Sequence, residues 1–245
     1  MLTFTPVIDG ETALFYYKPN FLNDSEYIEL KQWLDSKTFV DGLCISGKRI
    51  PRQQLWFQTE SNYFCKKWRY QYERWTSNPY EDTLTKIQNK INDFAKTIKT
   101  IHNNDIIQIP NINSCLINKY RDGGDSIRPH RDTPDSFGIY PTIIGLSIGS
   151  PRKFTIKKID YDPSNITSLR HDDNTELNMD ITLEDNSIFI MAGASQKYFT
   201  HEIPKCETQD LRYSLTFREY IDKSLDKSLD KSLDKSLDKS LDKSN

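Results

Sequence analysis

The chain has 245 residues, a formal net charge of −2 and 36% hydrophobic residues. No stretch approaches the roughly 18 consecutive apolar residues of a membrane span, and residues 1–10 lack the basic region and apolar run of a signal peptide. We therefore expect no membrane partner. A net charge near zero does not exclude a nucleic-acid partner, because binding depends on local charge.

The cysteines are scattered and form no Cys-x-x-Cys pair. They are Cys44, Cys65, Cys115 and Cys206. This spacing supports neither a zinc finger nor a disulfide framework, and free thiols are typical of a reducing compartment. We therefore expect an intracellular protein, in the nucleus or the cytoplasm.

The C-terminal segment from Asp222 repeats Asp-Lys-Ser-Leu and ends at Asn245. Its six Asp and six Lys residues cancel in charge. With one apolar residue in four it cannot bury a core, and Ser and Asp are unfavourable inside a helix. We expect residues 222–245 to be a disordered low-complexity tail, and residues 1–221 to form one domain of a monomer.

A strand and a helix are predicted near the N-terminus. Residues 14–19 are apolar and aromatic up to a final proline, which predicts a short strand. Asn23 and Glu26 then have the spacing of a capping box, in which each side chain accepts from the backbone N–H of the other residue. Apolar residues follow at helical spacing, so we expect a packing helix near 24–36.

Residues 44–75 are irregular and rich in both aromatic and basic side chains. The densest runs are 48–53 and 66–75. Basic side chains bind phosphate and aromatic rings stack on bases, so this composition favours contact with a single-stranded or flipped nucleotide. The alternative is a solvated hairpin whose aromatic side chains face the core, and composition alone does not separate the two.

The clearest helix begins near residue 78. Asn78 can cap it, Pro79 suits the first helical position and Glu81 stands at the third. An apolar stripe at helical spacing follows, made of Leu84, Ile87, Ile91, Phe94 and Ile98. We expect this stripe to face the core, and Asn103–Asn104 to mark the end of the helix.

Beyond residue 105 the pattern changes to short strands. We expect them at 114–120, 127–132, 142–148, 153–159, 179–183, 187–191, 197–203 and 211–220. Many short strands at this spacing are typical of a sandwich or barrel. The polar segment 160–178 is expected to be a surface loop, and its His171 to be solvated and not a ligand.

The stretch 118–132 ends in a His-x-Asp motif, His130-Arg131-Asp132. Alternate side chains of a strand share a face, so His130 and Asp132 would supply an imidazole and a carboxylate to one metal ion. The third ligand must come from elsewhere in a chain with four histidines. Two His and one carboxylate suit a non-heme Fe(II) oxygenase. The motif alone is weak, since most such pairs lie on loops or solvated strands.

Two further strands gather polar residues on one face. By alternation Asn118 and Tyr120 share a face of the first strand. The polar face of the second holds Arg212, Ser214, Thr216 and Arg218. Two guanidinium groups suit a dicarboxylate, because arginine binds carboxylates through paired hydrogen bonds. The alternative is an ordinary strand with its polar face in water.

Together these motifs resemble the AlkB family of Fe(II)- and 2-oxoglutarate-dependent dioxygenases, which remove alkyl groups from nucleic-acid bases. The series consists of Asn118-x-Tyr120, His130-x-Asp132, His201 and Arg212-x-Ser214-x-Thr216-Phe217-Arg218, in order over about residues 40–220. The resemblance implies a mainly β fold with bracing helices. Its core would be a double-stranded β-helix (jelly roll) with an N-terminal nucleotide-recognition lid at about 44–76.

The resemblance also implies a role for each matched residue. The metal ligands at the catalytic centre would be His130, Asp132 and His201. The 2-oxoglutarate co-substrate would be bound by Asn118, Tyr120, Arg212, Ser214 and Arg218, with Arg212 on the carboxylate far from the metal. The substrate would be bound by Pro51, Arg52, Tyr70, Tyr72 and Asp135.

The chain departs from the family pattern at two positions. Ser214 stands where many relatives have Asn, and its hydroxyl can still form a hydrogen bond. Pro134 occupies the position where several relatives have an acidic residue that helps to recognise the base, and Asp135 lies one residue further on. The base preference is therefore open, whereas the iron chemistry is not affected.

The function implied by the resemblance is oxidative dealkylation of methylated DNA or RNA, in repair or demethylation, with succinate, CO₂ and an aldehyde as products. A hydroxylase or demethylase of the same fold that acts on a protein is one alternative. A nucleic-acid-binding protein without turnover is another. The basic and aromatic lid favours nucleic acid over protein, and the complete set of ligands and arginines argues against an inactive binder.

Overall fold

The structure is a computed structural model that describes residues 1–43, 47–58, 76–98, 100–102, 105–107, 109–132, 134–138, 140–165, 168–173 and 175–221. The predictions for Tyr70, Tyr72, most of the lid and the tail 222–245 lie outside the described residues. The side chain of Asp135 does so as well.

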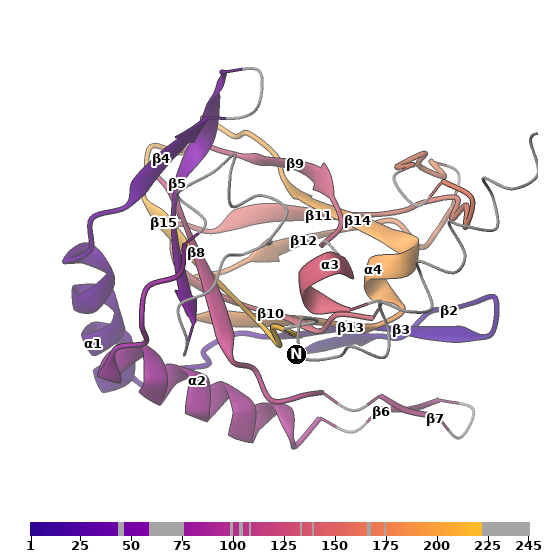
Figure 1. The fold of residues 1–245 in the computed structure, drawn as a ribbon, viewed down its shortest axis with the longest axis horizontal. Helices are drawn as coiled ribbons and strands as arrows, with labels where there is room; N and C mark the ends of the chain where they lie inside the picture. Colours follow the sequence, from indigo (N-terminus) through magenta and orange to yellow (C-terminus); the bar gives the residue numbers. More distant parts are fainter. Residues whose placement is uncertain are drawn as a thin grey trace, which may run out of the picture.

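Among the described residues, nine antiparallel strands form the larger of two facing sheets (Figure 1). Their order is β1 (Leu2–Phe4), β3 (Glu11–Lys18), β13 (Ser187–Gly193), β10 (Ile143–Gly149), β15 (Arg212–Arg218), β8 (Ser114–Tyr120), β5 (Arg49–Gln58) and β4 (Val40–Leu43), with β2 (Val7–Ile8) paired to β3. Most neighbours in this sheet are far apart in the chain, as in a jelly roll.

The second sheet packs over the first and is smaller. Its order is β12 (Met179–Leu183), β11 (Arg152–Lys158), β14 (Phe199–Ile203) and β9 (Ile127–His130). Two short helices, α3 (Pro134–Phe137) and α4 (Ser195–Tyr198), lie at one end of the space between the sheets (Figure 1). The predicted jelly-roll core is thereby confirmed. The strands β6 (Thr100–His102) and β7 (Asp105–Ile107) form a separate hairpin.

Helix α1 (Asp24–Asp35) forms where the capping box predicted it. The side chain of Asn23 accepts a hydrogen bond from the backbone N–H of Glu26, and the Glu26 carboxylate accepts one from the backbone N–H of Asn23. These two bonds satisfy N–H groups that the first helical turn leaves without partners.

Helix α2 (Asp82–Ala95) is shorter at both ends than predicted. Asn78 does not cap it, because its backbone N–H and its side-chain amide both donate to the carbonyl of Trp56, at 2.7 and 3.0 Å. Asn78 is therefore bound to strand β5, and Glu81 occupies the N-cap position without a side-chain cap bond. The chain leaves the helix at Lys96 and enters the β6–β7 hairpin, so the predicted stop at Asn103–Asn104 is wrong.

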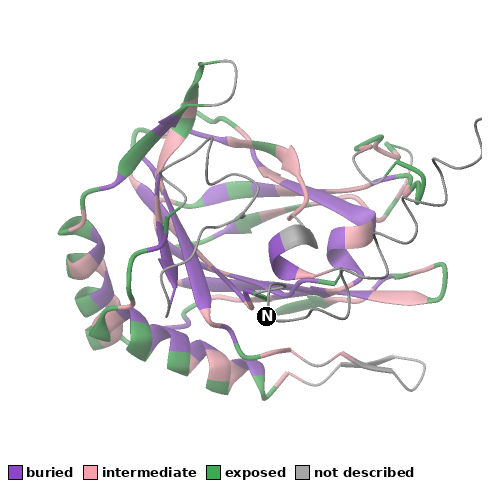
Figure 2. Ribbon diagram, in the orientation of Figure 1, coloured by how far each residue is buried: buried purple, intermediate pink, exposed green. Residues whose placement is uncertain are grey.

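Strand alternation sends side chains of the larger sheet into two separate cores. On β15, Tyr213, Leu215 and Phe217 pack with the helices α1 and α2. The opposite face of the sheet looks toward the smaller sheet, where Phe15 and Phe189 belong to the second core. In Figure 2 the strands of the sheet are mostly buried, whereas each of the helices α1 and α2 has exposed residues along one face.

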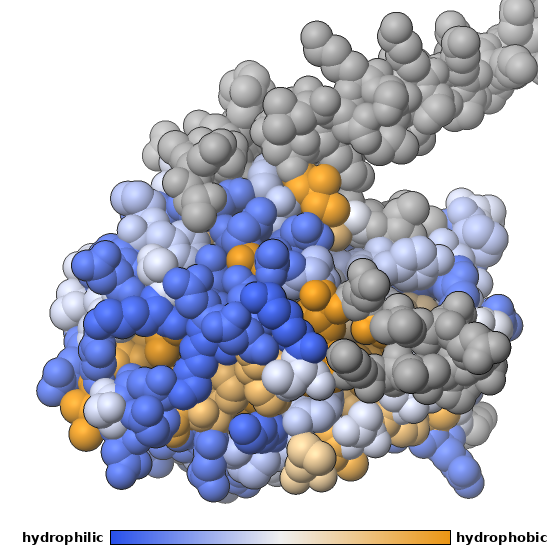
Figure 3. Space-filling model, turned by 90° about the horizontal axis from the view of Figure 1, so that it is seen from below, coloured by the Kyte–Doolittle hydropathy of each residue, from blue (hydrophilic) through white to orange (hydrophobic). Residues whose placement is uncertain are grey.

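The face seen from below in Figure 3 is largely hydrophilic, with hydrophobic residues showing in patches between the hydrophilic ones. Three residues of the predicted apolar stripe are buried beneath it, since Leu84, Ile87 and Ile91 of α2 are at most 4% exposed, whereas Phe94 and Ile98 are partly buried. The part of the chain that the structure describes has no helix with the length and apolar character of a membrane span.

Two strands near the predicted metal ligands are shorter than expected. The strand predicted at 127–132 ends at His130, so Asp132 lies beyond it. The run predicted as a strand at 197–203 begins as helix α4 and becomes strand β14 only at Phe199. The turn expected at Gly193 is present, and this residue has a φ of 57°, in the left-handed region that favours glycine.

Candidate active site

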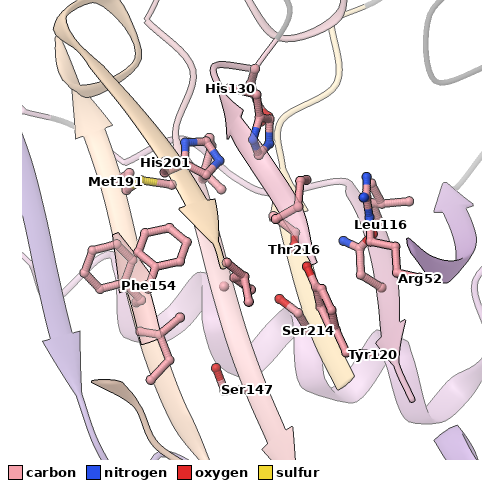
Figure 4. A pocket seen from close by; sticks show the side chains of 18 of the residues that line it. Arg52, Leu116, Tyr120, His130, Ser147, Phe154, Met191, His201, Ser214 and Thr216 are labelled. Carbon is pink, nitrogen blue, oxygen red and sulfur yellow. The ribbon is translucent and has the colours of Figure 1, made fainter. Parts of the chain in front are cut away.

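A cavity of about 280 Å³ lies between the two sheets (Figure 4). Apolar side chains such as Phe154, Phe189 and Met191 form one part of its wall. Polar side chains from β5, β8, β10 and β15 form another part. Ligand pockets commonly combine an apolar lining with a few placed polar groups, so this cavity has the character of a ligand-binding site.

His130, Asp132 and His201 meet at this cavity. One potential ligand atom from each lies within 4.8 Å of the others. His130 and His201 are direct partners across the β9–β14 pair, and their ring centroids are 4.2 Å apart. Within the described ranges, this is the one group of three His, Cys, Asp or Glu side chains close enough to share a metal ion. The structure thus brings together the three residues that the resemblance assigned as metal ligands.

Asp132 reaches the group by a route that strand alternation did not predict. Because β9 ends at His130, other residues fix the position of Asp132. Its backbone N–H donates to Oε1 of Gln196 on α4 at 3.1 Å. Its carboxylate accepts two hydrogen bonds from Arg218, one from Nη2 at 3.1 Å and one from Nε. The side chains of this ion pair are 4% and 5% exposed, so the pair is buried.

The three side chains have the protonation states that bind a cation. Burial lowers the pKa of His130 and takes that of His201 well below its usual value, so both imidazoles are favoured as neutral. Burial acts to raise the pKa of Asp132, but the guanidinium of Arg218 outweighs it, and the net pKa is lowered.

The tautomer of His130 follows from one contact. Its Nδ1 lies 2.9 Å from the backbone carbonyl oxygen of Arg128, and a carbonyl oxygen only accepts. Nδ1 therefore carries the proton, and Nε2 keeps a lone pair for a metal. With a second neutral imidazole and a carboxylate, these residues fit a divalent transition-metal ion such as Fe(II).

A row of polar side chains crosses the wall of the cavity over four adjacent strands. Gln54 on β5 lies opposite Asn118 on β8. Asn118 lies opposite Ser214 on β15, which lies opposite Ser147 on β10. All four line the cavity, and Ser214 appears beside Tyr120 in Figure 4. The two polar faces predicted from alternation thus lie on neighbouring strands, with Asn118 directly opposite Ser214.

Arg212 is fully buried beside Tyr120, its partner across the β8–β15 pair. Its Nη2 donates to Oγ of Ser147 at 2.8 Å, and its Nη1 donates to the carbonyl of Leu183 at 3.3 Å. Its Nε has no partner among the described residues. Burial lowers the pKa of Arg212 to about 10. The alternative of a solvated polar face on this strand is therefore wrong.

Arg152 is a third buried arginine, at 2% exposure, and no sequence pattern marked it as a site residue. Its guanidinium lies 5.6 Å from the ring centre of Tyr120. It donates to the carbonyls of Asp122, Asp125 and Pro204, at 3.2, 2.9 and 2.6 Å. Arg152 therefore joins the loop after β8 to the segment after β14, beside the site.

Pro51 and Arg52, predicted to bind substrate, lie on β5. Pro51 is exposed, whereas the side chain of Arg52 lines the cavity. Nε of Arg52 donates to Oδ1 of Asn118 at 2.9 Å, and Nη1 donates to the carbonyl of Ser126 at 3.2 Å. The contact of either residue with substrate stays a prediction, and Arg52 in addition touches a residue assigned to the co-substrate.

His171 lies outside the ligand group, as predicted. Its Nε2 is 2.9 Å from Oγ1 of Thr200, and the residue is partly buried. The ring is therefore partly solvated, with one hydrogen-bond partner on β14.

The sequence did not single out three polar residues of the site. Gln54 had a usable signal, since it stands two residues after Arg52 and so shares its strand face. Ser147 also had one, as a polar residue within an apolar strand. Gln196 had none, because its contact with Asp132 depends on how α4 packs.

A family model described as the 2OG-Fe(II) oxygenase superfamily matches residues 14–218. Among curated proteins, the chain is 36% identical over 108 residues to the alpha-ketoglutarate-dependent dioxygenase alkB homolog 3 of Rattus norvegicus, covering 43% of this chain and 35% of that protein. It is 30% identical over 118 residues to the DNA oxidative demethylase ALKBH2 of Arabidopsis thaliana, covering 43% and 37%. The chain thus spans little more than a third of the length of these relatives.

Among solved structures, OsALKBH1 matches with a TM-score of 0.52 and 15% identity, over 84% of this chain and 97% of that one. A prolyl hydroxylase of Trichoplax adhaerens, in complex with a hypoxia inducible factor peptide fragment, matches with a TM-score of 0.53 and 14% identity, over 86% and 84%. At these identities the likeness shows the fold. The resemblance to AlkB proteins that the motif series indicated is confirmed by the curated relatives.

Proposed function

We propose that this chain, which belongs to the 2OG-Fe(II) oxygenase superfamily, oxidatively removes N-linked alkyl groups from nucleic-acid bases. The observation that carries the proposal is the convergence of His130, Asp132 and His201 on one cavity between the sheets. The family supplies the dioxygenase class and its two requirements, Fe(II) and 2-oxoglutarate. The names of the curated relatives, alkB homologues and a DNA oxidative demethylase, support nucleic acid as the substrate class.

His130, Asp132 and His201 would hold Fe(II). When bound, the metal and 2-oxoglutarate would supply chemistry in which one oxygen atom of O₂ converts an N-linked alkyl carbon to a carbinol and the other enters succinate, with CO₂ released. The carbinol carbon then separates from the base as an aldehyde. The protein's own part is to orient the reactants and to exclude water from the site.

The charge on the wall suits a dicarboxylate co-substrate. Arg52, Arg131 and Arg218 line the cavity, and Asp132 is the one carboxylate among its described lining residues. A divalent cation adds further positive charge. An incoming dianion is therefore attracted to the cavity and balances part of this excess.

Each predicted co-substrate residue carries a hydrogen-bond donor. Arg212 would pair with the carboxylate far from the metal, and its buried Nε is a donor without a described partner. Tyr120 lies beside Arg212 and would add its hydroxyl. Asn118 and Ser214 line the cavity and would donate hydrogen bonds. Arg218 would remain near the metal end, next to Asp132.

The substrate would be methylated DNA or RNA. A base within a duplex cannot reach a buried metal, so it must be flipped out or already unpaired. Tyr70 and Tyr72 would stack on the base, Pro51 and Arg52 would contact the duplex or its phosphates, and Asp135 would help to recognise the base. The family resemblance favours 1-methyladenine and 3-methylcytosine as the targets.

The proposal is tested by succinate release from 2-oxoglutarate, measured with methylated oligonucleotide, with unmethylated oligonucleotide and without nucleic acid. We expect release to rise several-fold with methylated oligonucleotide, and Asp132→Ala to abolish it. Failure of every methylated oligonucleotide, single- or double-stranded, DNA or RNA, would contradict the proposal. Stimulation by a peptide substrate would then favour a protein hydroxylase, and no turnover at all would favour a binding protein.

A further inference from the structure

The amide of Asn118 is held by two donors on the neighbouring strand. Its Oδ1 accepts a hydrogen bond from Nε of Arg52 at 2.9 Å and another from Nε2 of Gln54 at 2.8 Å. Gln54 and Asn118 are 4% and 6% exposed and are direct cross-strand partners. A buried carbonyl oxygen that accepts two hydrogen bonds is fixed in place, since losing them would leave it unsatisfied.

The contact with Arg52 also establishes the orientation of the Asn118 side-chain amide. Oxygen and nitrogen of a side-chain amide are normally distinguished only by their partners. A guanidinium has donors and no acceptor, so the Asn118 atom that faces Arg52 must be the oxygen. The Gln54 atom that faces this oxygen must then be its nitrogen. The nitrogen of Asn118 is left at the other end of the amide, on a residue that lines the cavity.

We propose that Arg52 and Gln54 are positioning residues that hold the amide of Asn118 with its nitrogen available to a carboxylate of 2-oxoglutarate. This inference rests on the co-substrate role of Asn118 in the proposed function. An amide turned by 180° would present an oxygen to that carboxylate, and two acceptors repel. The contacts on β5 therefore contribute to co-substrate affinity without touching the co-substrate.

Arg52 thereby has a second role, in co-substrate binding. The resemblance assigned it as a substrate contact within the predicted lid. Its Nε is committed to Asn118, so its loss would weaken co-substrate binding even where no nucleic acid is present. A loss of 2-oxoglutarate affinity measured without nucleic acid would distinguish this role from contact with nucleic acid.

The test is a double-mutant cycle on full-length, Mn(II)-loaded protein, with binding of 2-oxoglutarate measured by calorimetry in the absence of nucleic acid. Gln54→Met keeps the size of the side chain and removes its donor. We expect the Kd for 2-oxoglutarate to rise about fivefold, as for the loss of one neutral hydrogen bond. Asn118→Ala should weaken binding about tenfold or more, and adding Gln54→Met to it should weaken binding no further, because the positioned group is gone.

Gln53→Met is the matched control. Gln53 is the preceding residue on β5, so its side chain points to the opposite face of the sheet. Its Kd for 2-oxoglutarate should equal that of the wild type. Gln54→Glu serves as a second variant should Gln54→Met fail to fold, because it replaces the donor by an oxygen and should weaken binding at least as much.

The outcomes are distinct. Unchanged 2-oxoglutarate affinity in a folded Gln54→Met protein would overturn the proposal. So would a fivefold loss that persists in the Asn118→Ala background, since this would indicate a general packing effect. Wild-type affinity in Asn118→Ala would overturn both the positioning role and the co-substrate role of Asn118. Turnover of methylated oligonucleotide is measured separately, so the substrate assignment stands or falls independently.

Discussion

Arg218→Met should destabilise the metal-free protein strongly and the metal-loaded protein much less. Arg218 makes two hydrogen bonds to Asp132, and the side chains of the pair are 4% and 5% exposed. Removing one partner of a buried ion pair leaves an uncompensated charge and costs about 3–5 kcal/mol. In a domain of this size, each kcal/mol shifts the melting temperature by about 2–4 °C, so we expect a decrease of about 6–20 °C.

The assay is thermal unfolding of wild type and variant, with and without a saturating divalent metal. A bound cation replaces the positive charge that Asp132 has lost, so the decrease should be smaller with metal. The double variant Arg218→Met with Asp132→Asn should regain part of the metal-free stability, because no charge is left buried alone. A metal-free Arg218→Met protein that melts within about 2 °C of wild type would refute this reasoning. An equal loss with and without metal would refute it too.

Four further predictions test other parts of the site and chain. His130→Ala should give a folded protein that forms no succinate, and normal turnover would contradict the metal assignment. Burial acts to raise the pKa of Asp125, but hydrogen bonds from Arg121 outweigh it and the net pKa is lowered. Asp125 therefore stabilises the folded state at pH values above its unfolded pKa of about 3.9, and this stabilisation is lost as the pH falls through the folded pKa. Asp125→Asn should therefore be less stable than wild type in urea at pH 7, with a difference that shrinks below about pH 4. Truncation after Asp222 should change neither turnover nor melting temperature, and a large drop in either would show that the tail docks. Tyr72→Ala should reduce demethylation by the equivalent of about 1–3 kcal/mol while leaving 2-oxoglutarate affinity intact, and wild-type activity should fall as salt rises.

Local patterns predicted those parts of the fold that depend on local physics. The capping box at Asn23 located helix α1 because both of its hydrogen bonds lie within three residues of each other. The strict alternation on β15 also depends only on residues that are neighbours in the sequence, and it correctly separated the core face of the strand from its cavity face. The start of α2 was misplaced because Asn78 is held on strand β5 by hydrogen bonds from its backbone N–H and its side-chain Nδ2 to the carbonyl of Trp56, and that pairing is not visible from spacing.

In the site, too, local patterns identified residues but did not explain what holds them in position. The ligand types at His130, Asp132 and His201 were visible in the sequence, yet the reason given for Asp132 was wrong. Strand alternation does not place its carboxylate; Arg218, 86 residues away, and Gln196, 64 residues away, do. Contacts over such separations depend on the register between strands and on helix packing, which a single sequence does not reveal.

Strand alternation could have placed Gln54 at the cavity, but it could not have shown what Gln54 contacts there. It shares the strand face of Arg52, but its importance comes from lying opposite Asn118. Arg152 had no local signal at all, since its partners are backbone carbonyls in two distant segments.

The central claim is that this site oxidises an alkyl group on a nucleic-acid base, and product stoichiometry tests it most directly. Purified protein with Fe(II), 2-oxoglutarate and O₂ would be given an oligonucleotide containing one 3-methylcytosine or 1-methyladenine, and succinate, formaldehyde and the unmodified base would be quantified together. The account predicts formaldehyde and unmodified base in equal amounts, with at least as much succinate, and none of the three with Asp132→Ala. Succinate without formaldehyde or base conversion on any methylated oligonucleotide would contradict it.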